Sequence, residues 1–162
     1  MKAIVAFLAF VSAATSAAVI SVDWQLPDWA QRQWAALSKS QMLDLSLRLN
    51  PFVWQGDFDG DKALDVAVLV KRRSDGKEGI AVLWRSGAAP TVLGAGTSFG
   101  GGGDDFSWIE FWGVEESGSL HEGYYADTIR LEADGLLVIK ETSASGLIYF
   151  DKREPQWQQQ RD

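Results

Sequence analysis

Eight short runs of apolar and β-branched residues follow Pro51, and they constrain the fold more than any other feature of the sequence. Turn-forming Gly, Asp, Asn or Ser separates them, at spacings of about 8 to 14 residues. The runs are FVWQG, LDVAVLVKR, GIAVLWRSG, PTVLGAG, FSWIEFWGV, DTIRLEADG, LLVIKET and SGLIYF. This texture predicts a mainly β fold, an antiparallel sheet, sandwich or small propeller-like β domain, with hairpin turns at Ser74–Lys77 and Glu132–Gly135.

Residues 27–49 precede these runs and predict an N-terminal helical segment packed on the β-rich part. Pro27 suits a first helical position, and Asp28 suits the positive end of the helix dipole. Asn50-Pro51 ends the segment, because a residue before proline avoids the helical region. The Ser38–Ser40 stretch leaves open a division into two shorter helices. An approximate apolar stripe is formed by Trp34, Leu37, Met42, Leu45 and Leu49.

Residues 1–17 have the pattern of a secretory signal peptide. Lys2 is followed by the apolar run 3–11 and by small residues at the expected cleavage site. The run is shorter than the roughly 20 apolar residues that cross a bilayer. We therefore expect residues 18–162 to be a single β-rich domain, soluble, not inserted in a membrane and exported to a bacterial periplasm.

The composition narrows the classes of partner and of chemistry. The chain has 22 Asp and Glu against 15 Lys and Arg, a net charge of −7, which disfavours nucleic acid and favours cationic partners. It has no cysteine. Disulfides, thiol nucleophiles and thiolate metal sites are therefore excluded.

The segment GDFDGDKALDVAVLV places four aspartates in nine residues directly before an apolar strand. Asp57, Asp59, Asp61 and Asp65 occupy positions 1, 3, 5 and 9 of a turn that Gly60 allows to curl. Carboxylates that converge on one point repel each other unless a cation lies between them, and hard oxygen ligands suit Ca²⁺. The alternative is a metal-free turn held by bonds from side chains to the backbone.

This loop resembles the calcium loop of the FG-GAP or VCBS repeats of integrin-type propellers and related exported bacterial proteins. The resemblance covers residues 57–68 and implies that Asp57, Asp59, Asp61, the carbonyl of Ala63, and Asp65 bind Ca²⁺. The family commonly has glycine at position 6, where this chain has Lys62. An EF-hand is excluded, since Val68 stands where that motif needs glutamate and a strand follows instead of a helix. We expect the calcium to be structural.

No motif of an enzyme active site is present, and we expect the protein not to be an enzyme. His121 is the only histidine, and neither a G-x-S-x-G elbow nor a phosphate loop occurs. A pair of carboxylates, as glycosidases use, is the remaining catalytic option. Its candidates are Asp104, Asp105, Glu110, Glu115 and Glu116.

Residues 94–106, GAGTSFGGGGDDF, predict a mobile loop that leads into the aromatic strand FSWIEFW. Four consecutive glycines make this segment too flexible for a strand. An acidic loop hinged by glycine can enter a cleft of a cationic partner. The partner-binding residues that we predict are Asp104, Asp105, Phe106, Trp108 and Glu110.

Two functional hypotheses follow. The chain loosely resembles periplasmic immunity proteins and lysozyme inhibitors. This implies a calcium-stabilised periplasmic protein that occludes a basic peptidoglycan hydrolase or a secreted antibacterial effector. The alternative is a calcium-dependent adhesion or glycan-binding module, in which exposed tryptophans stack on sugar rings.

Overall fold

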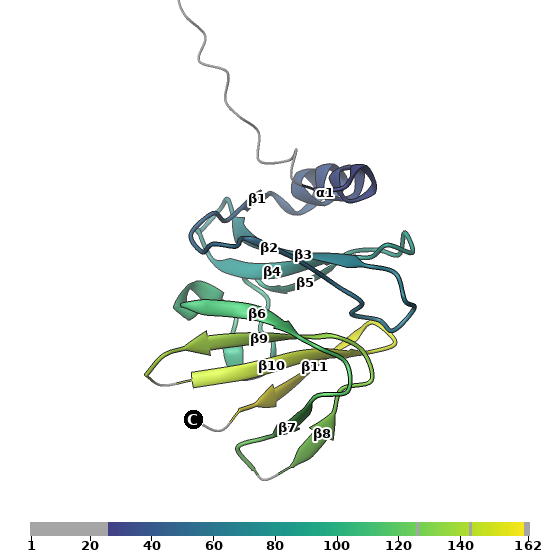
Figure 1. Ribbon diagram of the computed structural model, residues 1–162. Coiled ribbons are helices and arrows are strands. Elements are labelled where there is room, and N and C mark those ends of the chain that lie inside the picture. The colour runs from purple at the N-terminus through teal and green to yellow at the C-terminus, as the bar shows by residue number, and fades with distance from the viewer. Residues whose placement is uncertain (1–25, 126, 143, 161–162) are drawn as a thin grey trace, which may run out of the picture.

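The computed structural model describes residues 26–125, 127–142 and 144–160, and the predicted signal peptide 1–17 lies outside these ranges. Within them the chain is mainly β with a single α-helix near its N-terminal end, which confirms the predicted fold class. Helix α1 (Asp28–Gln41), two antiparallel sheets and a small hairpin lie in successive layers (Figure 1). No helix in the described ranges is both long enough and apolar enough to cross a membrane.

The first sheet lies between α1 and the second sheet. Its strand order is β1-β3-β4-β5, and β2 also pairs with β3. Its strands are β1 (Leu43–Leu45), β2 (Val53–Gly56), β3 (Asp65–Arg72), β4 (Glu78–Leu83) and β5 (Thr91–Gly94). On β3, Val66, Val68 and Val70 pack toward α1. Ala67 and Leu69 pack toward the second sheet, so both faces of this strand are buried.

The second sheet faces the first across the larger core. It has the order β11-β10-β9-β6, with every pair antiparallel. Its strands are β6 (Phe111–Glu115), β9 (Gly135–Lys140), β10 (Ala144–Asp151) and β11 (Glu154–Gln159). Trp84, directly after β4, contacts Phe150 of β10 edge to face, with ring centroids 5.1 Å apart. The two sheets thus form a β-sandwich.

The hairpin of β7 (Leu120–Glu122) and β8 (Thr128–Arg130) lies beyond the second sheet (Figure 1). It is joined to β11, because the Tyr124 N–H donates to the Gln159 carbonyl over 2.8 Å and the Gln158 amide donates to Asp127. Helix α1 covers the outer face of the first sheet, whereas this hairpin of two three-residue strands lies on the outer side of the second.

Two element predictions were wrong. The predicted helical segment 27–49 begins as expected but ends at Gln41, because Met42 takes a left-handed conformation with φ of 55° and β1 follows in antiparallel pairing with β3. Glu132–Gly135 is not a hairpin turn, since it connects β8 to β9, which belong to different sheets. Ser74–Lys77 does join the paired strands β3 and β4, and Gly76 has the expected positive φ.

Candidate metal site and candidate binding surface

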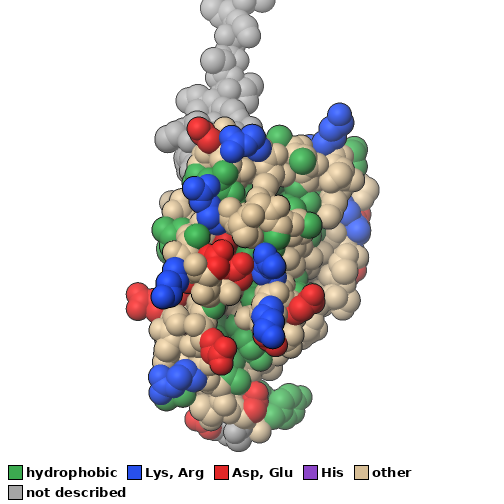
Figure 2. Space-filling model, turned by 90° about the vertical axis from the view of Figure 1, so that its right-hand side faces the viewer, with side chains coloured by type: hydrophobic (Ala, Val, Ile, Leu, Met, Phe, Trp, Pro, Cys, Tyr) green, Lys and Arg blue, Asp and Glu red, His purple; other side chains and the backbone are tan. Residues whose placement is uncertain are grey.

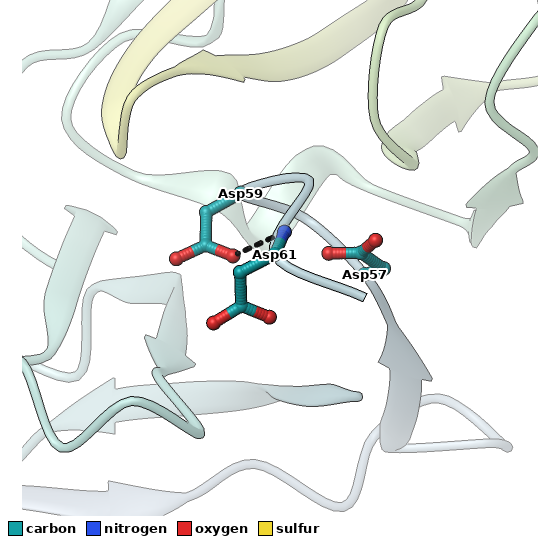
Figure 3. A group of neighbouring side chains, drawn as sticks. All are labelled: Asp57, Asp59 and Asp61. Carbon is teal, nitrogen blue, oxygen red and sulfur yellow. Dashed lines mark hydrogen bonds between the residues drawn. The ribbon is translucent and has the colours of Figure 1, made fainter. Parts of the chain in front are cut away.

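The aspartate loop lies between β2 and β3 and brings three carboxylates together (Figure 3). One oxygen from each of Asp57, Asp59 and Asp61 lies within 4.8 Å of the others, so this group could hold a metal ion. The side chain of Asp59 is only 7% exposed. The turn closes on itself, because the Asp61 N–H donates to Asp59 Oδ1 over 3.3 Å.

The Oδ1 atom of Asp57 is the strongest indication that this group binds a cation. The atom is buried and has no hydrogen-bond partner among the described residues, while Oδ2 accepts from the Lys62 N–H over 3.0 Å. A buried anionic oxygen without a partner loses its hydration and gains nothing in return. A cation between the three carboxylates would supply the missing interaction, and hard oxygen donors of this kind suit hard cations.

Lys62 occupies the position at which the resembling family commonly has glycine. Its φ is 68°, so the loop does take the left-handed turn there, with a residue that carries a Cβ. Its side chain is exposed. The backbone at position 62 therefore has the conformation that favours glycine, although the residue there is lysine.

Asp65 lies at the start of β3 and is fully buried. Its oxygens accept from the Arg85 N–H over 2.7 Å and from the Phe58 N–H over 3.2 Å. The pKa of Asp65 is raised to about 6, because burial and the nearby Asp59 carboxylate together outweigh the lowering effect of the two N–H donors. The three-carboxylate group does not include Asp65. For Ala63, the structure gives a backbone N–H that donates to Asp61 Oδ1 over 2.8 Å.

Asp134 is part of this site, although the sequence analysis did not single it out. Its Oδ2 accepts from the Asp57 N–H and its Oδ1 accepts from the Ser117 N–H, each over 2.9 Å. Its own N–H donates to the Asp57 carbonyl, also over 2.9 Å. Asp134 thus fastens the aspartate loop to the segment between β8 and β9. The two residues are 77 positions apart, so no local pattern could have indicated the contact.

Residues 94–106, which the sequence predicts as a mobile loop, make specific contacts with β4 and with the residues that follow the segment. Asp104 pairs with Lys77, and Asp105 accepts from the N–H groups of Glu78 and Ser107, each over 3.0 Å. Burial raises the pKa of Asp105, but these two donors outweigh it and hold that pKa below its usual value. Phe106 is 1% exposed and belongs to the core. These residues hold the segment in place.

The glycine run has a packing role. The backbone of residues 100–102 wraps Trp157, and a Cβ at Gly100 would overlap the indole ring. Gly146 on β10 lies against the same ring and would also overlap it with a side chain. The glycines let two backbones approach one tryptophan, and this geometry requires residues without a side chain.

The exposed aromatic side chains are not those that the sequence analysis selected. Trp108 is half-buried and donates to the Gly102 carbonyl over 3.0 Å, while the exposed Glu110 accepts from the Glu141 N–H over 2.9 Å. Every tryptophan in the described ranges is buried or half-buried. The exposed aromatic residues there are Phe111, Tyr124 and Tyr125, with 58%, 60% and 84% exposure.

Three of the five carboxylates considered for catalysis form hydrogen bonds or ion pairs with other residues, a fourth, Glu115, lies near His121, and Glu116 is exposed. Asp104 and Asp105 make the contacts given above, and Glu110 supports the turn at Glu141. Glu115 Oε2 lies 3.6 Å from His121 Nε2, and this histidine side chain is only 13% exposed, so His121 is not a solvated loop residue.

A groove lies between β8 and the end of β10. It encloses about 400 Å³ and is lined by Ile129, Arg130, Leu131, Glu132, Ala133, Tyr149, Phe150 and Asp151. The sequence predicted none of these residues as a binding site, because the groove exists only where the β7–β8 hairpin meets the second sheet.

Comparison of the chain with protein-family models, curated proteins and solved structures found no match.

Proposed function

We propose that the protein is a calcium-stabilised periplasmic binding protein that inhibits a cell-wall hydrolase or a secreted antibacterial effector by occluding its cleft. In this proposal the partner is a basic protein, and the chain performs no chemistry of its own. Export to the periplasm rests on the signal-peptide pattern of residues 1–17.

The distribution of charge is the observation that carries the proposal. Residues 26–105, which include α1 and the first sheet, have ten acidic and nine basic side chains. Residues 106–160, which include the second sheet and the β7–β8 hairpin, have ten acidic and only four basic side chains. A negative electrostatic field that is concentrated on one half of a molecule attracts and orients a cationic partner.

The burial of the tryptophans disfavours the glycan-binding alternative, which requires exposed tryptophans. Stacking on a sugar ring needs an open aromatic face, and the tryptophans of the described ranges are buried or half-buried. Trp157 in particular lies against Gly100 and Gly146. Tyr124 and Tyr125 are exposed on the β7–β8 hairpin, and tyrosine is enriched in protein interfaces.

Calcium supports the fold in this proposal and does not contact the partner. The group of three carboxylates and the unpartnered Asp57 Oδ1 support a cation site at the junction of β2, β3 and the β8–β9 segment. Figure 2 shows acidic side chains gathered near the middle of one face with Lys and Arg around them. A cation held by Asp57, Asp59 and Asp61 would fix the aspartate loop, which hydrogen bonds between Asp57 and Asp134 fasten to the β8–β9 segment.

Calcium binding is tested by calorimetry and thermal unfolding with Ca²⁺, with Mg²⁺ and with a chelator. We expect one Ca²⁺ per chain and a stabilisation of about 2.7 kcal/mol when free Ca²⁺ is 100 times the Kd. Asp59→Asn together with Asp61→Asn should abolish both effects. Equal unfolding temperatures in Ca²⁺ and in chelator would contradict the calcium site.

Inhibition is tested by mixing the purified protein with a panel of basic peptidoglycan hydrolases and following the clearing of a cell-wall suspension. The panel includes hen egg-white lysozyme and the secreted hydrolases of the source bacterium and its competitors. We expect stoichiometric inhibition of at least one enzyme, weakened by high salt. If every enzyme keeps its full activity at about a tenfold excess of the protein, the inhibitor proposal is wrong, since an excess on this order saturates a tight complex.

A further inference from the structure

The groove between β8 and β10 combines an aromatic floor with two carboxylates that have no partner among the described residues. Ile148 and Phe150 of β10 point into the core, so Tyr149 and Asp151 project to the opposite face, where the groove lies. Asp151 and Glu132 are exposed. Within the described ranges, no hydrogen bond or ion pair is formed by either of these two side chains.

The basic side chain at the groove is directed elsewhere. Arg130 lines the groove, but its Nη1 donates to the Gly118 carbonyl over 2.7 Å in the turn before β7. Leu131 is 3% exposed and Ile129 is half-buried, so they form an apolar wall. An elongated apolar stem ending in a positive charge would match the apolar wall, the tyrosine ring and the two carboxylates.

We propose that this groove binds an arginine or lysine side chain from an exposed segment of a basic protein partner. The stem lies along Ile129 and Tyr149, and the charged head lies between Glu132 and Asp151. A guanidinium group makes the stronger fit, because it is planar, stacks on aromatic rings and can bond two carboxylates at once. The inference rests on the proposed function for the identity of the partner, and on the groove alone for the chemistry of recognition.

This site differs from the one that the sequence predicted, since Asp104 and Asp105 are already bonded to Lys77, Glu78 and Ser107. The groove lies in the half of the chain with ten acidic and four basic side chains. Charge complementarity therefore holds for the whole half as well as for the two carboxylates.

The test uses acetyl-Gly-Arg-Gly-amide as a probe and the citrulline peptide as its neutral control of nearly equal shape. Backbone amide NMR of the full protein is recorded during titration in Ca²⁺. We expect saturable shifts centred on residues 129–133 and 149–151 with the arginine peptide, and at least about tenfold weaker binding of the citrulline peptide.

Variants locate the contact. Glu132→Gln with Asp151→Asn should weaken binding of the arginine peptide at least about tenfold. Asp28→Asn with Glu141→Gln removes two exposed charges elsewhere and should leave binding within about twofold, since distant exposed charges are screened by salt. Shifts that centre on residues 57–61, equal binding of both peptides, or equal effects of the two double variants would each overturn the groove as a basic-residue site.

The outcome separates this inference from the proposed function. If the arginine peptide binds in the groove while no hydrolase is inhibited, the groove stands and the inhibitor proposal fails. If a hydrolase is inhibited equally by the wild type and by Glu132→Gln with Asp151→Asn, the inhibitor proposal stands and the groove is not its docking site.

Discussion

Lys62 and Asp134 are the two residues on which the geometry of the aspartate loop depends most. Lys62 has a φ of 68°, which a residue with a Cβ adopts at a cost, and its N–H donates to Asp57. Asp134 uses both carboxylate oxygens to hold the N–H groups of Asp57 and Ser117. The first could be identified from the spacing of the motif, whereas the second requires the tertiary structure.

Lys62→Gly should stabilise the protein by about 0.5–1 kcal/mol. The gain from relieving the left-handed conformation exceeds the added backbone entropy that glycine gives the unfolded chain. Urea unfolding in chelator measures the change. Lys62→Ala removes the same positive charge but keeps the Cβ, so it should give no such gain. Equal stabilities of the glycine and alanine variants would show that the left-handed φ carries no strain.

Asp134→Asn should destabilise the protein by about 1–3 kcal/mol, because the amide nitrogen would face one of the two N–H donors and leave it unpaired. If the loop holds Ca²⁺, its affinity should fall by about 10-fold to 100-fold, the usual effect of losing a residue that orients a ligand. Calorimetry and urea unfolding give the two values. Glu141→Gln is the control, since it alters an exposed acid remote from the loop. Unchanged Ca²⁺ affinity in Asp134→Asn would show that Asp134 does not orient Asp57.

At the scale of the elements, burial and pairing between segments determine which strands can be predicted from the sequence. The apolar runs of β3 and β4 predicted strands correctly because both faces of these strands are buried, so their apolar character is continuous. β7 and β11 are polar, with sequences LHE and EPQWQQ, and they carry little signal of their own. β1 continued an apolar pattern that also fits a helix, and its pairing with β3 fixed the outcome.

Gly100→Ala should destabilise the protein by about 2 kcal/mol or more. The new methyl group would overlap the Trp157 ring, and the φ of 52° at this position disfavours a residue with a Cβ. Gly113→Ala on β6 meets open space without a positive φ, and it should be neutral or slightly stabilising. Thermal unfolding of the two variants provides the comparison. Equal unfolding temperatures would mean that the glycine run does not clamp Trp157.

At the scale of the whole molecule, the arrangement of the layers explains the groove at β8 and β10, which the composition could not predict. The number of short apolar runs predicted a mainly β fold, and the spacing of the apolar stripe predicted an N-terminal helix. The structure has both. The sequence could not show that a helix covers the first sheet while a short hairpin lies on the second, since this depends on where α1 and the β7–β8 hairpin pack. The groove at β8 and β10 follows from that arrangement, and its residues come from two segments with no shared motif.

The stability of the molecule should depend on pH through Asp65. Its pKa is raised from 3.8 to about 6 in the folded state, so the folded chain holds this proton more tightly than the unfolded chain. The contribution is fully present below about pH 3.8, and about 3 kcal/mol is lost as pH rises through about 6. Urea unfolding in chelator from pH 4 to 7 should show this fall in the wild type and not in Asp65→Asn. Parallel profiles would contradict it, and saturating Ca²⁺ should flatten the wild-type profile.

The burial of β3 on both faces has a consequence before the chain has folded. Its run VAVLV has high β-propensity, no charge and no proline, the signature of segments that self-associate into cross-β aggregates. Four aspartates precede the run and Lys71, Arg72 and Arg73 follow it. Charges at both ends act as gatekeepers, because parallel in-register stacking would bring like charges together. We therefore expect the aspartate loop to disfavour aggregation of the nascent chain, in addition to any part it has in the folded state.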